Sequence, residues 1–206
     1  MYSYVLEFNL ARHGDDAEEY LHDAARLWPK LWADIPGVQG TLLLSSALAL
    51  GGEFDYQWRV DIEALSTLAR IDETIKAADG GWRRSTEKYY AARTASRASV
   101  SRHVAGDEAY SRSQKGTDGA IHLVVHSGAE SARLADRVDA VRSASGVLSA
   151  QALQPVLATG QEQLWLRLEA LDALDGLDEV VRADLGGGAR LFGELREVDG
   201  ALFAGA

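Results

Sequence analysis

The stretch from Leu164 to Gly188, LWLRLEALDALDGLDEVVRADLGGG, nearly repeats an earlier stretch from Gln57 to Trp82, QWRVDIEALSTLARIDETIKAADGGW. When Ile62 is placed on Leu168, nine of the 21 aligned positions are identical. Self-similarity of this length is typical of a duplicated structural unit. The identical positions in the first copy are Glu63, Ala64, Leu65, Leu68, Asp72, Glu73, Ala77, Gly80 and Gly81.

Each copy predicts a strand followed by a helix. The strand is indicated by apolar residues at every second position, which are Trp58, Val60 and Ile62 in the first copy and Leu164, Leu166 and Leu168 in the second. Helical spacing follows at Leu65, Leu68, Ile71 and Ile75, and again at Leu171, Leu174, Leu177 and Val181. The paired glycines after each run are typical of helix ends.

The segments before and after these pairs repeat the same order. Alternating strands are predicted around Leu6 and Leu123, and helices over 15–35 and 131–143, with a kink at Pro29. A turn and a second strand follow each helix, and closing strands are predicted at 97–104 and 189–198.

The unit is therefore strand, helix, strand, strand, helix, strand, which is the ferredoxin-like motif. We predict an α+β protein with two tandem ferredoxin-like βαββαβ repeats, 1–106 and 119–206, joined by a polar linker at 107–118. Each antiparallel sheet would have helices on one face only, so the two sheets are expected to pack face to face.

Composition limits the class of function. The chain has 206 residues, a net charge of -10 and no cysteine. The negative charge disfavours nucleic acid and anionic membranes as partners, and the absence of cysteine excludes disulfides, thiolate metal sites and a cysteine nucleophile. The start of the chain lacks the pattern of a signal peptide, and the longest apolar run, TLLLSSALAL, is half the length of a membrane span. We expect a soluble, cytoplasmic protein.

These features resemble the dimeric α/β-barrel superfamily, which includes antibiotic-biosynthesis monooxygenases, polyketide cyclases and heme-degrading monooxygenases. The residues that carry the resemblance are IPGVQG at 35–40 and GEFDYQWRVDIEAL at 52–65. Most members pair as homodimers, so the resemblance implies a fused pseudo-dimer, with a homodimer of that pseudo-dimer as one further assembly. The second copy has Ser145 and Gly146 where the first has Pro36 and Gly37, which indicates that the two copies have diverged.

The resemblance also implies catalytic residues. Several members use an asparagine on the first strand to polarise the substrate or oxygen, and Asn9 lies at the matching position. When the two first strands are aligned by their apolar residues, His126 falls opposite Asn9 and His122 opposite Val5. Asn9 and His126 are therefore candidates for proton transfer or for binding an oxyanion. In the alternative interpretation, Glu7, Asn9, His122 and His126 only line the polar part of the interface between the sheets.

Aromatic residues are the candidate walls of a substrate pocket, and packing in an ordinary core is the alternative. The segment 83–97 has no counterpart in the second copy and is expected to form a lid or a solvated insertion. The candidate substrate-binding residues are Trp28, Trp58, Trp82, Tyr89, His122 and Trp165.

The sequence predicts no metal site and no cofactor-binding motif. His122 and His126 lie four residues apart on a strand, about 13 Å, which is too far for both to bind one metal ion. The heme-degrading members carry an axial histidine on their second helix, and ARIDETIKAADGG has none. The resemblance implies a cofactor-independent monooxygenase of aromatic, polyketide-like substrates. The alternatives are a cyclase or isomerase acting in the same pocket, or a non-catalytic protein that binds small molecules.

Overall fold

The computed structural model describes residues 1–11, 15–77, 79–107, 120–127, 134–158, 161–177, 188–198 and 201–204. The N-terminal half contains β1 (Tyr2–Leu10), α1 (Asp15–Arg26), α2 (Trp28–Ala33), β2 (Val38–Ser46), β3 (Tyr56–Ile62), α3 (Thr67–Ala77), α4 (Gly81–Ala92) and β4 (Arg93–Gly106). The C-terminal half contains β5 (Ile121–His126), η1 (Leu134–Arg137), α5 (Val138–Arg142), β6 (Val147–Leu157), β7 (Gln163–Leu168), η2 (Leu171–Leu177), β8 (Ala189–Val198) and β9 (Ala201–Ala204).

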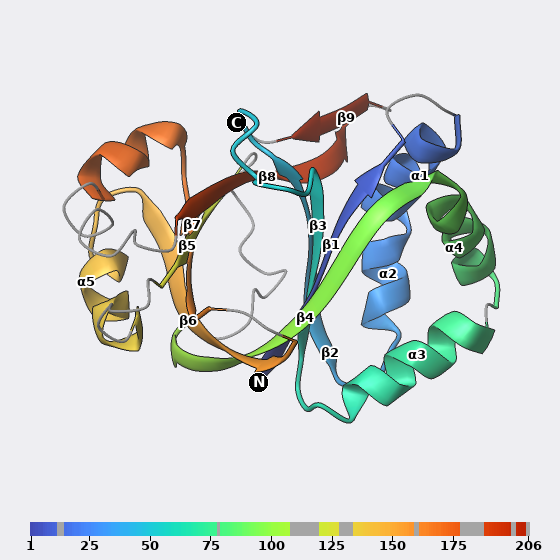
Figure 1. Ribbon diagram of the computed structural model, residues 1–206, viewed down its shortest axis with the longest axis horizontal. Coiled ribbons are helices and arrows are strands. Elements are labelled where there is room, and N and C mark those ends of the chain that lie inside the picture. The colour runs from blue at the N-terminus through green and yellow to red at the C-terminus, as the bar shows by residue number, and fades with distance from the viewer. Residues whose placement is uncertain are drawn as a thin grey trace.

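The strands form one antiparallel sheet that closes on itself. Their order is β2-β3-β1-β4-β6-β7-β5-β8, and β8 also pairs with β2, so eight strands make a closed ring with β9 attached to β8. Figure 1 shows this ring with α1 to α4 outside one half and α5 outside the other. The expected two sheets are thus joined at both edges, because β4–β6 and β2–β8 pairings satisfy backbone groups that two separate sheets would leave open.

The order of strands is the same in the two halves. β2-β3-β1-β4 in the first half corresponds to β6-β7-β5-β8 in the second. Local details agree as well: Gly37 and Gly146 both have positive φ angles, of 94° and 78°, and each carbonyl accepts a hydrogen bond from a glutamate N–H after the third strand. Those N–H groups belong to Glu63 and Glu169, at N–O distances of 2.8 and 2.9 Å.

The helices differ in part from the prediction. Pro29 lies in the first turn of α2, where a missing N–H costs nothing, so the expected kinked helix is instead two helices that meet at Leu27. In the C-terminal half, the described parts of the two expected helices are η1 with the short α5, and the 3-10 helix η2. Gly176 within η2 disfavours a longer α-helix at this point. The expected linker lies almost entirely outside the described residues.

The segment 83–97 forms most of a packed helix and the start of a strand, and many of its side chains are exposed. Residues 83–92 belong to α4, which packs against α1 and buries Trp82, Ser85, Tyr89 and Ala92. The remaining residues begin β4, which is therefore longer than the predicted strand at 97–104. In the part of the chain that the structure describes, no helix is both long and apolar enough to cross a membrane.

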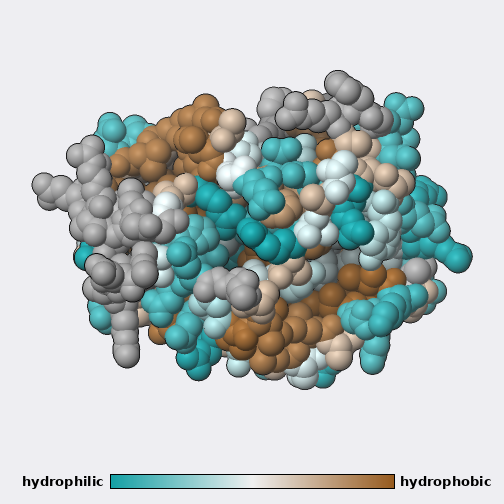
Figure 2. Space-filling view, viewed as in Figure 1, coloured by the Kyte–Doolittle hydropathy of each residue, from teal (hydrophilic) through white to brown (hydrophobic). Residues whose placement is uncertain are grey.

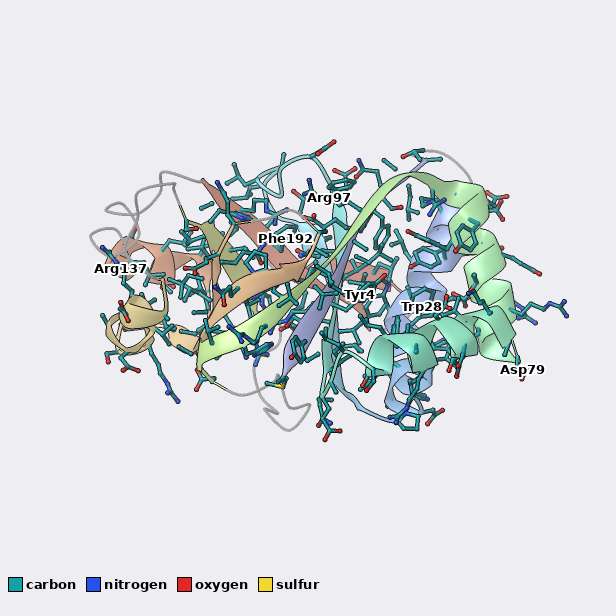
Figure 3. All side chains as sticks on the ribbon, turned by 60° about the horizontal axis from the view of Figure 1, so that its bottom comes forward. Tyr4, Trp28, Asp79, Arg97, Arg137 and Phe192 are labelled. Carbon is teal, nitrogen blue, oxygen red and sulfur yellow. The ribbon has the colours of Figure 1, made fainter. Side chains whose placement is uncertain are left out.

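Three apolar cores result from this arrangement. Two lie between the outside of the ring and the helices, one in each half, and the third lies inside the ring. The inner core takes side chains from both halves, namely Val5, Leu44, Val124, Leu153, Trp165 and Phe192. In Figure 3, Phe192 lies among the strands of the ring, whereas Trp28 lies on the side that the helices cover.

Candidate functional site

A polar cavity opens at one end of the ring, next to the inner core. Its volume is about 440 Å³, within the range of small-molecule sites. A second cavity of about 340 Å³ shares Arg97, His126, Gln161 and Arg190 with it. The first cavity, called here the mouth cavity, is lined by Glu7, Arg97, Ser99, Ser101, His126, Pro155, Leu157, Ala158, Gln161, Gln163 and Arg190. Figure 2 shows hydrophilic residues gathered over the middle of the face seen along the ring, between apolar areas.

The pairing of β4 explains why a cavity forms here. β4 pairs with β6 only from Val100 to Gly106, and the partner of Val100 is Leu157 at the end of β6. Before Val100 the two strands separate, so Arg97 and Ser99 face a space that no described strand fills on that side. Glu7 of the neighbouring strand β1, which is paired with Arg97, also lines this space, and His126 of β5 and Arg190 of β8 reach it from across the ring.

Four charged or titratable side chains meet at this opening, and we call Glu7, Arg97, His126 and Arg190 the mouth cluster. Arg97 donates to Oε2 of Glu7 from Nε at 2.9 Å and from Nη2 at 2.7 Å. Arg190 donates from Nη1 to Oε1 of the same carboxylate. The Glu7 side chain is only 6% exposed, so its pairing with two guanidinium groups compensates for its burial.

His126 is held as a neutral imidazole. Arg190 Nε donates to His126 Nε2 at 3.0 Å, so this ring nitrogen carries no proton and the proton lies on Nδ1. Burial, with the positive charge of Arg190, lowers the pKa of His126 to about 4. With His126 neutral, two guanidinium groups and one carboxylate give the mouth cluster a net charge of +1, in a chain whose net charge is -10. The two guanidinium groups can attract a small anion to this opening, and the Glu53 carboxylate, 3.9 Å from Arg97, offsets part of their charge.

Asn9 does not line either of these two cavities. Its Nδ2 donates to the carbonyl of Glu53 at 3.0 Å, and its Oδ1 accepts from the N–H of Asp55 at 2.7 Å. Both polar atoms of the side chain are thus bonded to the loop between β2 and β3. The two predicted catalytic residues therefore have different surroundings. His126 lines the cavity, and Asn9 is hydrogen-bonded to the loop beside it.

The predicted aromatic wall is packed as core. Trp28 and Trp58 stack with ring centroids 5.3 Å apart, and Trp82 and Tyr89 join the same aromatic cluster. All four side chains are buried, between the outside of the ring and helices α1 to α4. Neither described cavity is lined by these residues, which favours the alternative of core packing.

His122 and Trp165 lie deeper inside the ring. Trp165 Nε1 donates to His122 Nδ1 at 3.0 Å, and His122 Nε2 lies 3.0 Å from Glu194 Oε1. Because an indole N–H can only donate, His122 Nδ1 must accept, and Nε2 carries the proton. Burial lowers the pKa of His122, which agrees with this neutral form. The two residues belong to a buried network with Glu194 and Arg167, which form an ion pair at 3.2 Å.

A second buried network lies near the start of β1. Arg59 pairs with Asp61 at 3.0 Å, and its guanidinium carbon lies 4.5 Å from the ring centre of Trp165. Burial alone would raise the pKa of Asp61, but Arg59, with hydrogen bonds from His103 and Ser3, lowers it to about 2. Arg59 also donates to Gln151 of the other half. Among the described residues, no group of three or more His, Cys, Asp or Glu side chains is arranged to hold a metal ion.

Sequence reasoning missed Arg97 and Arg190. Each lies in a strand with alternating residues, RASVS at 97–101 and ARLFG at 189–193. The alternation shows which face of its strand each arginine occupies, but it does not show that both pair with Glu7. In the alternative interpretation Glu7 and His126 line the polar interface between the sheets, and the structure brings these two residues to one opening. The pairing of Glu7 with Arg190 joins positions 183 residues apart, which local patterns do not encode.

Solved structures with the same arrangement of strands cover nearly the whole chain. A candidate monooxygenase from Fusobacterium nucleatum matches with a TM-score of 0.63 and 12% identity, over 100% of this chain and 92% of its own. A candidate monooxygenase from Lactobacillus acidophilus matches with a TM-score of 0.58 and 11% identity, over 100% and 96%. The chain has the dimeric α/β-barrel fold.

Two further barrels with this fold are an anthrone oxidase-like protein and a candidate chlorite dismutase. The anthrone oxidase-like protein has a TM-score of 0.56 and 11% identity, over 100% of this chain and 96% of its own. The chlorite dismutase has a TM-score of 0.57 and 12% identity, over 97% and 95%. No family model matches the sequence, and no curated protein does. At these identities the likeness concerns the fold, and the chemistry depends on this chain's own residues.

Proposed function

We propose that this protein is a monooxygenase of small phenolic or enolic molecules, including aromatic, polyketide-like ones, and that the reaction takes place in the mouth cavity. The observation that carries the proposal is the mouth cluster: a neutral histidine and two arginines beside one buried carboxylate, in a cavity of about 440 Å³. The likeness of the fold to candidate monooxygenases and to an anthrone oxidase-like protein supports the same reaction class.

The cluster favours ionisation of the substrate. A phenol or enol that gives its proton to solvent water at the opening becomes an anion, which Arg97, Arg190 and the Nδ1–H of His126 are suited to stabilise. Such an electron-rich anion reduces oxygen directly, so the substrate itself supplies the electrons and no separate cofactor is required. For an anthrone, one oxygen atom replaces the two hydrogens of the CH₂ group, and the other oxygen atom leaves with those hydrogens as water.

The walls of the cavity suit a flat molecule with one polar edge. Ser99, Ser101 and Gln163 offer hydrogen-bonding groups, and Pro155 and Leu157 offer apolar surface. A ring system can lie against the apolar residues while its oxygen atoms face the serines and the cluster. The packed aromatic core that contains Trp28 and Trp58 has no role in this proposal.

The test is oxygen consumption with anthrone and with a hydroquinone, followed by mass spectrometry of the product under ¹⁸O₂. A monooxygenase gives a product that carries one labelled oxygen atom, and the Arg190→Gln variant loses most of this activity. Arg102→Gln is the matched control, because Arg102 is exposed, donates to Gln154 and lines neither cavity. A product without labelled oxygen would indicate a cyclase or isomerase. Ligand binding without turnover would indicate a binding protein.

We also propose that the barrel is a fused pseudo-dimer of two ferredoxin-like repeats. The repeated strand order, the positive φ angles of Gly37 and Gly146, and the nine identities between the copies support this origin. The mouth cluster is not duplicated, since the aligned partner of His126 is Asn9. The proposal therefore includes divergence, in which residues of both repeats form one reaction site at one end of the barrel.

A further inference from the structure

We propose that Asn9 is a positioning residue for the mouth cavity, which acts by holding the loop between β2 and β3 underneath Arg97. The inference deepens the proposed function and rests on it for the effect on turnover. Asn9 lies next to the end of β1, where the pairing with β4 has an irregular step between Asn9 and Leu10. Its side chain bonds Glu53 and Asp55 at the point where the β1–β3 pairing has ended at Phe8 and Tyr56.

The residue between these two bonds links Asn9 to the cavity. Phe54 is buried, at 4% exposure, and the guanidinium carbon of Arg97 lies 5.1 Å from the centre of its ring. Glu53, on the other side, lies 3.9 Å from Arg97 Nη1 and lines the second cavity. When Asn9 fixes the backbone of residues 53–55, it therefore fixes one aromatic and one acidic contact of Arg97.

Arg97 depends on such contacts more than its partners do. Its side chain is 53% exposed, whereas those of Arg190 and Glu7 are 15% and 6% exposed. A long exposed side chain has many rotamers, and each loss of a neighbour increases the entropic cost of holding one of them. Arg190 is only 15% exposed and packed within the cluster, so it depends less on the loop, although its aliphatic chain lies beside Gly52 of that loop.

The test is an NMR experiment on protein with ¹⁵N-labelled arginine. The Nε–H signal of Arg97 is assigned by its loss in Arg97→Lys, and that of Arg190 by its loss in Arg190→Lys. In Asn9→Ala we expect the Arg97 signal to shift or broaden clearly more than the Arg190 signal, because Arg190 touches the loop only at Gly52, outside the span 53–55 that Asn9 bonds. In Thr74→Ala, which removes another hydrogen bond from a side chain to a backbone carbonyl, both signals should stay unchanged.

Two further variants keep the test decisive if Asn9→Ala fails to fold. Asn9→Asp keeps the acceptor for the Asp55 N–H and removes the donor to Glu53, so it should perturb the Arg97 signal less than Asn9→Ala does. Phe54→Leu removes the ring below Arg97 and should perturb the same signal without any change at Asn9. An Arg97 signal that is unchanged in folded Asn9→Ala, or in both of the other variants, overturns the inference.

Turnover separates this inference from the proposed function. If the protein oxidises a phenol or anthrone, Asn9→Ala should raise KM about three- to tenfold with little change in kcat, from the ordering cost of one long side chain. A large fall in kcat at unchanged KM would instead make Asn9 a participant in the chemistry and overturn its positioning role. If no substrate is turned over, the proposed function fails, and the NMR comparison still decides the role of Asn9.

Discussion

Glu7 determines how strongly the mouth cluster attracts an anion. Its carboxylate is buried and accepts hydrogen bonds from Arg97 and Arg190. Its negative charge therefore neutralises part of the positive charge that would attract a substrate anion. The same carboxylate keeps the two guanidinium groups in place at the opening. Its two effects on the site therefore have opposite signs: it weakens anion binding through charge and favours it through geometry.

The first prediction concerns Glu7→Gln. This change raises the net charge of the cluster from +1 to +2 and leaves the shape of the side chain nearly intact. We expect affinity for benzoate, used as an anionic probe, to rise about fivefold or more, because one added charge near the ligand is worth about 1 kcal/mol or more at short range. The free energy of unfolding should fall by about 2 kcal/mol or more, because an ion pair loses one buried partner.

Isothermal titration calorimetry and urea denaturation measure the two effects of Glu7→Gln. Glu63→Gln removes the same charge from an exposed position outside the cavity and should change neither quantity much. Weaker binding of benzoate by Glu7→Gln would contradict the assignment of the cluster as an anion site. Benzamide, which has no charge, should bind Glu7→Gln and the wild type with equal affinity.

The second prediction concerns pH. The pKa of His126 is about 4 in the folded protein and about 6.5 in an unfolded chain. Between these values the unfolded state binds a proton that the folded state does not, so the free energy of unfolding decreases as pH falls from about 6.5 to about 4. Below about pH 4 both states are protonated at His126, and its contribution to the decline is complete.

Urea denaturation at several pH values tests this dependence. The His126→Gln variant should decline less between pH 6.5 and 4 than the wild type. His122 also has a lowered pKa, so part of the decline remains in the variant. Identical slopes for the two proteins would show that His126 titrates normally.

At the scale of elements, the helices of the N-terminal half and the ring enclose an aromatic core. None of the buried residues of this core lines the mouth cavity. Trp28 in α2 contacts Tyr20 in α1, Trp58 in β3 and Trp82 in α4. Its Nε1 donates to Ser85, which is also buried. One side chain therefore joins three helices to the sheet, which is the role of a core residue.

The third prediction follows from this packing. Trp28→Ala should lower the free energy of unfolding by about 3–5 kcal/mol, because it removes a large buried ring and leaves a cavity. Benzoate affinity at the mouth cavity should stay within about twofold of the wild type under conditions where the variant is folded, since Trp28 does not line that cavity. A small loss of stability together with a large loss of affinity would instead make Trp28 part of a ligand site.

At the scale of the whole molecule, neither half is complete alone. The inner core draws Val5 and Leu44 from one half and Val124, Trp165 and Phe192 from the other. Arg59 of the first half donates to Gln151 of the second. The sheet is continuous across both junctions, so separating the halves would expose two strand edges and the inner core together.

The fourth prediction is that the two halves unfold together. Calorimetry should give a single transition whose calorimetric and van 't Hoff enthalpies agree, as for one cooperative unit. Tyrosine and tryptophan fluorescence should report the same midpoint as circular dichroism. Two separate transitions, or different midpoints for the two probes, would show that the halves are independent domains.

The sequence by itself determined most of the strands and which of their residues alternate toward a buried face. Period-two alternation located β1, β3, β5 and β7, and the repeated block around Leu65 and Leu171 predicted the same strand order in both halves. These features depend on neighbours along the chain, because burial of alternate side chains is a local property of a strand. Helices were less certain, since the described second-half segments form 3-10 and short α-helices where α-helical spacing was expected.

Only the tertiary structure decided which residues form the site. Pairing of β8 with β5 places Arg190 beside His126, and closure of the ring at β2–β8 and β4–β6 carries Arg190 to Glu7. Packing within the N-terminal half places Trp28 and Trp58 under the helices, outside the ring, and bonds Asn9 to the loop between β2 and β3. The register between distant strands depends on many packing and hydrogen-bonding contacts between residues far apart in the chain. A short stretch of sequence therefore does not determine it.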